Sequence, residues 1–199
     1  MESLDKQIRK VGLNNGLIFG VIVLVLGIFA FYFMTQMTTS FWMVVLVGPI
    51  LFSLLIPIVI LIFYCIDFRK KIGGYWTFKQ AFTGIFIMLL VAYIVTAIGR
   101  DLVFAKLVEP NMLEKTQSAI VNSSRSMMEQ SGTDQATIDT KVADMQKTFD
   151  DQKDMSIGKV IKAQAIALVV VLIFALIFGA IFKRNPLKGL DEPAIEPAV

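Results

Sequence analysis

Four long apolar stretches constrain this chain more than any other feature of its sequence. They cover residues 13–34, 41–66, 81–99 and 163–182. Each is close to the roughly 20 apolar residues that a helix needs to cross a bilayer. The whole chain is 56% hydrophobic and 18% charged, whereas a soluble domain has about 45–50% apolar and about 25% charged residues. The sequence therefore predicts an all-α integral membrane protein, built as a four-helix bundle.

Basic residues are concentrated between the apolar stretches. Ten of the nineteen Lys and Arg residues lie in three short segments, before the first stretch, after the second and after the fourth. The loop at residues 35–40 has no charged residue. Because short cytoplasmic loops carry an excess of Lys and Arg, we expect both termini to lie in the cytoplasm. The first stretch is longer than the apolar region of a signal peptide and ends without a small-residue cleavage site, so we expect it to be retained.

A polar insert, residues 100–162, separates the third and fourth stretches. It carries nine basic and ten acidic residues, and long segments count weakly in the charge rule, so we expect it outside the cytoplasm. Apolar residues recur at helical spacing on both sides of a turn at Ser131-Gly132. They are Leu113, Ile120 and Met127 before the turn, and Ile138, Val142, Met145 and Phe149 after it. The pattern predicts an extracytoplasmic helical hairpin, whose two apolar stripes either bury each other or form a surface for a protein partner.

Small residues recur along one face of the first and fourth predicted helices. Gly12, Gly16 and Gly20 are spaced by four residues in the first. The fourth carries Ala167, Ala175 and Gly179. In a bilayer, where apolar burial does not drive helices together, small residues let two backbones approach closely. We expect these positions to pack helices together, either within one chain or between two copies.

Side chains suited to catalysis or metal binding are scarce. The chain has no His and a single Cys, Cys65, inside the second stretch. No Asp, Glu, Lys or Arg lies in the centre of any stretch, although such residues are the usual mark of a functional site in a membrane. The net charge of +3, with basic residues near the membrane ends, does not favour nucleic acid as a partner. We therefore expect no enzymatic activity, no metal and no cofactor.

Two further features bear on function. The segment Pro49–Pro57 predicts a bent second helix, and Tyr93 and Thr96 are polar positions late in the third. The segment Tyr75–Phe78 is aromatic and includes Trp76. Aromatic rings are enriched at the level of the lipid headgroups, so this segment predicts an interfacial anchor at the start of the third helix.

The segments Gly74–Phe82, Glu109–Glu114 and Met128–Gly132 resemble a bacterial family of small membrane proteins, numbered 4199 among the domains of unknown function. The similarity extends from about Leu4 to Pro186 and includes the four-span layout with a polar helical insert. It implies an integral protein of the bacterial cytoplasmic (inner) membrane and brings no activity or site residues. We expect residues 1–186 to form a single membrane domain and residues 187–199 to form a disordered tail.

Two functions fit these observations. The first is a non-enzymatic scaffold or accessory protein, which meets a partner through the external hairpin and otherwise contacts the lipid bilayer. The second is a small transporter or channel subunit, in which Pro49–Pro57, Tyr93 and Thr96 line a path. Four spans are few for a transporter, so the second function requires self-association. A role in handling lipid is a third alternative.

Overall fold

The computed structural model describes residues 4–153 and 157–184, and nearly all of these residues are helical. Four helical segments, Leu4–Met37, Met43–Lys71, Phe78–Val108 and Gly158–Phe182, are long and apolar enough to cross a membrane. They are called the first to fourth spans below. The predicted all-α architecture with four spans is confirmed.

Each span consists of one or more helical elements. The first span is α1 (Leu4–Tyr32) and η1 (Phe33–Met37). The second is η2 (Met43–Val47), α2 (Gly48–Ile50), η3 (Leu51–Leu55) and α3 (Ile56–Lys71). The third is α4 (Phe78–Ala97) and η4 (Ile98–Val108), and the fourth is α7 (Ile157–Phe182). Between them lie α5 (Met112–Gln130) and α6 (Gln135–Lys153), and the η elements are stretches of π-helix.

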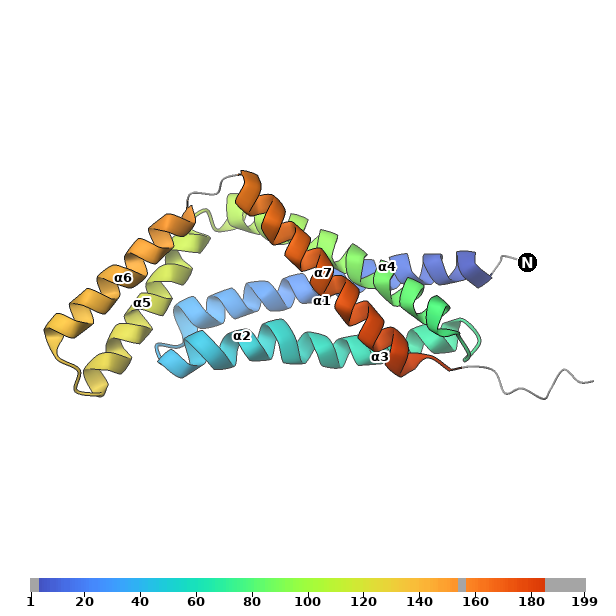
Figure 1. Cartoon of the computed structure of the whole chain (residues 1–199), viewed down its shortest axis with the longest axis horizontal. Helices are drawn as coiled ribbons and strands as arrows, with labels where there is room; N and C mark the ends of the chain where they lie inside the picture. The colour runs from blue at the N-terminus through green and yellow to red at the C-terminus, as the bar shows by residue number, and fades with distance from the viewer. Residues whose placement is uncertain (1–3, 154–156, 185–199) are drawn as a thin grey trace, which may run out of the picture.

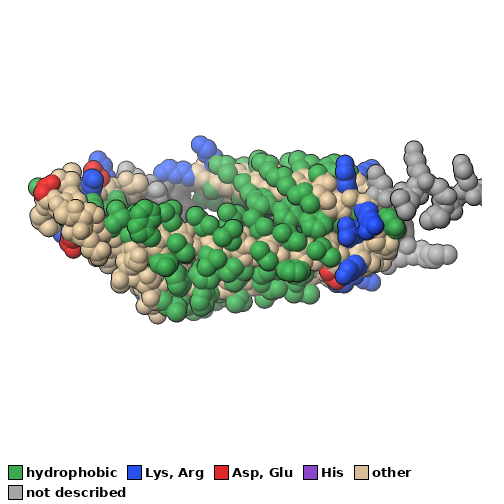
Figure 2. Space-filling view, turned by 90° about the horizontal axis from the view of Figure 1, so that it is seen from below, with side chains coloured by type: hydrophobic (Ala, Val, Ile, Leu, Met, Phe, Trp, Pro, Cys, Tyr) green, Lys and Arg blue, Asp and Glu red, His purple; other side chains and the backbone are tan. Residues whose placement is uncertain are grey.

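The molecule has two different ends. The start of α1, the connection from α3 to α4 and the end of α7 lie together at one end, and α5 and α6 lie at the other (Figure 1). Lys and Arg side chains gather at the first end, a broad hydrophobic belt follows, and both charge signs occur at the hairpin end (Figure 2). This distribution is that of a protein whose basic end is held at one membrane surface.

The third span lies at the centre of the bundle, because α4 packs against both α1 and α7. The main core contains Ile85 and Met88 of α4, Ile8 of α1, and Cys65 and Phe68 of α3, each exposed by 1% or less. Many large apolar side chains of the spans are exposed, above all on α7. In a bilayer this exposed surface faces lipid, so it needs no protein cover.

The first and third spans approach closely along the glycine face of α1. A Cβ atom placed on Gly16 would lie 2.7 Å from the carbonyl oxygen of Met88, and one on Gly20 would lie 2.9 Å from the Cα of Ala92. Real Cβ atoms essentially never come closer than 3.0 Å to such atoms. The glycines therefore set how closely the two backbones pack, as small residues do between membrane helices.

The second span contains two prolines. Pro49 lies in the first turn of α2, and Pro57 lies in the first turn of α3. Proline has no N–H to donate to the preceding turn, and its ring clashes with the carbonyl four residues earlier. The π-helical segments η2 and η3 directly precede these two elements, which is how local widening of a membrane helix accommodates proline.

A clasp joins the end of the fourth span to the start of the third. The backbone N–H of Trp76 donates to the carbonyl of Arg184 (2.9 Å), and the N–H of Arg184 donates back (3.0 Å). The indole Nε1–H of Trp76 donates to the carbonyl of Phe182 (2.6 Å). Trp76 is only 1% exposed and packs on Phe68. The prediction that Trp76 is an interfacial anchor was therefore wrong, although Tyr75 is 41% exposed.

Candidate functional site

A cleft of about 320 Å³ lies between the four spans and is called the intramembrane cleft. Its lining includes Phe19 of α1, Pro57 of α3, Tyr93 of α4 and Phe174 of α7. These residues all lie near the middle of their spans. Pro57 of the second span and the polar positions Tyr93 and Thr96 of the third, which were noted separately in the sequence, thus meet at one place.

The cleft has few polar groups, and they are largely occupied. Thr96 Oγ1 donates to the carbonyl of Gly20 (3.2 Å), and the hydroxyl of Tyr93 donates to Oε1 of Gln164 on α7. Ser53 adds a third hydroxyl, and none of the lining residues carries a charge. Such a lining can hold an apolar chain, but it offers no charged group to an ion or to a chemical step.

A small apolar core lies between the two helices of the hairpin. Met128 of α5 packs with Ile138 and Val142 of α6 in a small core, which Val121 and Met145 border. Ile138 is 1% exposed and Val142 is 9% exposed. The predicted α6 residues Ile138 and Val142 are thus buried within the hairpin, whereas on α5 the buried residue is Met128 and not the predicted Leu113, Ile120 or Met127.

The other members of the predicted partner surface differ in exposure. Ile120, Met127 and Phe149 are half-buried. Leu113, near the membrane end of α5, is 51% exposed. The hairpin surface that remains open is therefore mainly polar.

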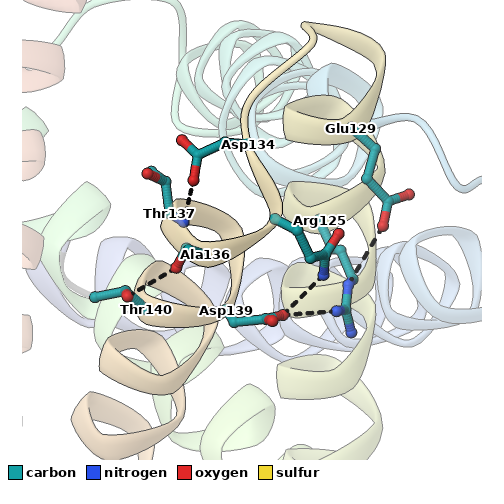
Figure 3. A network of polar contacts seen from close by, with 8 residues as sticks. Arg125, Glu129, Asp134, Ala136, Thr137, Asp139 and Thr140 are labelled. Carbon is teal, nitrogen blue, oxygen red and sulfur yellow. Dashed lines mark hydrogen bonds and ion pairs between the residues drawn. The ribbon is translucent and has the colours of Figure 1, made fainter.

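Ion pairs and hydrogen bonds tie the tip of the hairpin together (Figure 3). Arg125 of α5 lies 2.9 Å from Oδ1 of Asp139 on α6 and 3.4 Å from Oε1 of Glu129. Gln135 donates to the same Asp139 oxygen (2.9 Å). These groups are exposed, and exposed ion pairs contribute about 0–1 kcal/mol each, so they orient the two helices more than they stabilise them.

Asp134 begins α6. Its carboxylate accepts a hydrogen bond from the backbone N–H of Thr137 (2.9 Å; Figure 3), as a helix-capping side chain does. Hydrogen bonds from the side chain and backbone of Thr137 lower the pKa of Asp134 below its usual value. The capped form is thus the ionised form.

Polar residues converge at the base of the hairpin, where α5 packs against η1 and η2. Glu114, Ser118 and Asn122, called the polar ridge, follow one another at spacings of four along α5. They line a cleft of about 420 Å³ that also includes Thr35 and Gln36 of the first span. The same three residues line a second cleft, of about 330 Å³, on the side of α6. This ridge was not predicted from the sequence, although the spacing of four residues is visible there.

The predicted packing residues lie mainly at contacts within the chain. Beyond the glycines of α1, Ala175 of α7 is fully buried and Ala167 is half-buried. A Cβ on Gly179 would lie 3.1 Å from the Cα of Phe82 on α4. Within residues 4–153 and 157–184, no group of three or more Cys, Asp or Glu side chains is placed to hold a metal ion.

Comparison with known proteins identifies a family whose function is not known. No curated protein and no solved structure shows a significant match to the chain. The profile of a family described as "Protein of unknown function (DUF4199)" matches residues 14–184. This match covers most of the first span and all of the other three, together with the hairpin and the clasp. The chain is therefore a member of the DUF4199 family of membrane proteins.

Proposed function

We propose that this protein is a non-enzymatic accessory or scaffold protein of the bacterial cytoplasmic membrane, which contacts a protein partner through its hairpin. The observation that carries the proposal is the polar ridge. Glu114, Ser118 and Asn122 stand between two clefts where the hairpin meets the ends of the first two spans. Amide, hydroxyl and carboxylate groups gathered in this way offer hydrogen bonds to a polar peptide or side chain.

The construction of the hairpin supports this role. Its apolar residues are used internally, in the small core around Ile138, so α5 and α6 keep each other in place. The ion pair between Lys115 Nζ and Glu109 Oε1 (2.6 Å) fixes the start of α5 relative to the end of η4. Recognition groups on rigid elements are held more accurately than groups on loops, and a polar surface suits a reversible contact more than an obligate one.

Enzymatic activity is not part of the proposal. The lining of the intramembrane cleft carries no charged side chain. The ion pairs of Arg125 with Asp139 and of Lys115 with Glu109 each include a side chain that is at least 43% exposed. Neither arrangement is the desolvated, titratable cluster from which most active sites are built.

Site-specific photocrosslinking in cells tests the proposal. A benzophenone side chain at Gln117, which lines the cleft between α5 and α6, is expected to give a protein adduct of discrete mass. Adding Ser118→Arg, which places a bulky charge on the polar ridge, is expected to abolish that adduct. The same probe at Ile177, a lipid-facing residue of α7, is the control. An adduct at Gln117 that persists with Ser118→Arg, or no protein adduct at all, counts against the proposal.

The proposed orientation puts both termini in the cytoplasm and the hairpin outside. Arg69, Lys70 and Lys71 in the last turn of α3 support it, together with the other basic residues at that end (Figure 2). A reporter fused after Ser131, at the tip of the hairpin, is expected to show extracytoplasmic activity. Cytoplasmic activity of the same fusion would reverse the orientation and remove the external partner with it.

The alternative function, a transporter or channel subunit, is supported by one observation: Pro57, Tyr93 and Thr96 line the same cleft. It requires several copies of the chain to enclose a path. Native mass spectrometry in nanodiscs tests this requirement directly. A strictly monomeric mass excludes the alternative and leaves the accessory role unaffected.

A further inference from the structure

We infer that the intramembrane cleft is a binding site for a single acyl chain of a bilayer phospholipid. This inference is independent of the hairpin and of any protein partner. The cleft lies beside Phe19, Pro57 and Tyr93, which are near the middle of three different spans. At this depth the medium around the protein is hydrocarbon, so lipid chains surround the mouth of the cleft.

The lining excludes polar occupants. Of its hydroxyl groups, that of Thr96 is bonded to the backbone of Gly20, and that of Tyr93 is bonded to Gln164. The rest of the lining is apolar apart from Ser53. A buried water needs about two to four polar partners, and apolar cavities stay dry. A site of this kind is filled by hydrocarbon or left empty.

The surrounding medium favours a lipid chain over a second copy of this protein. Acyl chains are present at this depth around every copy of the chain. A helix of a second copy is a rigid rod about 10–12 Å across, and it would need an interface of its own to stay there. A flexible acyl chain can follow a cleft of about 320 Å³ that residues of all four spans line.

The cleft lies at an irregular point of the second span. Pro57 begins α3 directly after the π-helical segment η3, and both elements contribute to the lining. The wall opposite is formed by Phe174 of α7 and Leu89 of α4. The cleft therefore lies where the second span changes from π-helix to α-helix at Pro57.

The test uses the full chain in nanodiscs that contain phosphatidylcholine with a photoactivatable diazirine on one acyl chain. Lipid around the protein can label exposed residues such as Ile177, but Phe19 and Leu61, which are 4% and 2% exposed, are reached only from inside the cleft. We expect labelling of Phe19 or Leu61, found by mass spectrometry of peptides. Labelling confined to exposed residues overturns the inference.

Paired tryptophan variants locate the labelling. Val170 lines the cleft and is 45% exposed, so Val170→Trp fills the mouth with little strain in the core. Ile177 is 49% exposed and does not line the cleft. Val170→Trp is expected to abolish labelling of Phe19, while Ile177→Trp leaves it unchanged. If Val170→Trp does not fold, Val171→Trp replaces it, with the helical circular dichroism signal as the criterion. Phe19 labelled equally in both variants, or cross-linked to a second copy, refutes the inference.

Discussion

Replacing Gly16 by alanine tests how tightly the first and third spans pack. The new Cβ would lie 2.7 Å from the carbonyl oxygen of Met88 and 2.8 Å from the Cβ of Val91. Ordinary contact begins at 3.4 Å, so α1 must retreat from α4 by about 0.7 Å at this point. The closest atom belongs to the backbone, and no side-chain rotation can relieve the clash. Overpacking of this kind costs about 1–3 kcal/mol.

Gly27 provides the matched control. A Cβ at Gly27 has no atom within 4 Å, so Gly27→Ala changes helix propensity without a clash. Alanine in place of glycine inside a helix is favourable by about 0.5–1 kcal/mol, and this gain applies to both substitutions. We therefore expect Gly27→Ala to be neutral or slightly stabilising. Gly16→Ala should be less stable than Gly27→Ala by about 1–3 kcal/mol.

The assay is unfolding of the purified chain in mixed micelles with increasing sodium dodecyl sulfate, followed by circular dichroism. A second readout is the hydrogen bond from Thr96 Oγ1 to the carbonyl of Gly20, at 3.2 Å. It crosses the same interface and must lengthen when α1 retreats, so infrared spectroscopy with a carbon-13 label on the Gly20 carbonyl should show a shift in Gly16→Ala alone. Equal stabilities for the two variants would refute the tight approach of α1 and α4.

Three further substitutions test other features of the chain. Trp76→Phe removes the indole hydrogen bond of the clasp and should lower stability by about 1 kcal/mol, whereas Trp42→Phe, at a residue 59% exposed, should have little effect in the same micelle assay. The lowered pKa of Asp134 means that its capping contribution is present above the usual aspartate pKa and is lost as pH falls through the lowered value. Asp134→Asn keeps a capping side chain without ionisation, so acid-induced exchange of the Thr137 amide, measured by NMR, should be reduced. Asn15 carries a buried amide whose Nδ2 has no hydrogen-bond partner among the described residues. Asn15→Leu removes this unpaired group and should raise the free energy of unfolding by about 1–3 kcal/mol. A lower free energy of unfolding would show that the amide has a partner.

The sequence predicted the spans well because their signal is physical and local. A helix that crosses hydrocarbon needs a minimum apolar length, and that length is visible without knowledge of any neighbour. The glycine spacing around Gly16 was visible for the same reason. The atoms that Gly16 meets, on Met88 and Val91, were not predictable, because spacing along α1 does not say which span packs against it.

Features that join distant segments were not predictable from local patterns. Trp76 lies in an aromatic segment next to basic residues, which is typical of the membrane interface, and its pairing with Arg184 appears only in three dimensions. The intramembrane cleft likewise combines residues from all four spans. The polar ridge is different, since Glu114, Ser118 and Asn122 are regularly spaced in sequence. A polar stripe on an exposed helix carries no signal of burial, so its spacing alone did not mark it as a site.

The clasp has a consequence for the order of assembly during synthesis. It joins Trp76 to Phe182, residues that are 106 positions apart, and contacts of long range form late because the intervening chain must first be ordered. The first and third spans can meet once residue 108 has left the ribosome. The fourth span follows only after the whole hairpin has been synthesised. Until then the start of the third span lacks its contact with the end of the fourth. During this interval the segment around Trp76 is accessible to a membrane chaperone or insertase.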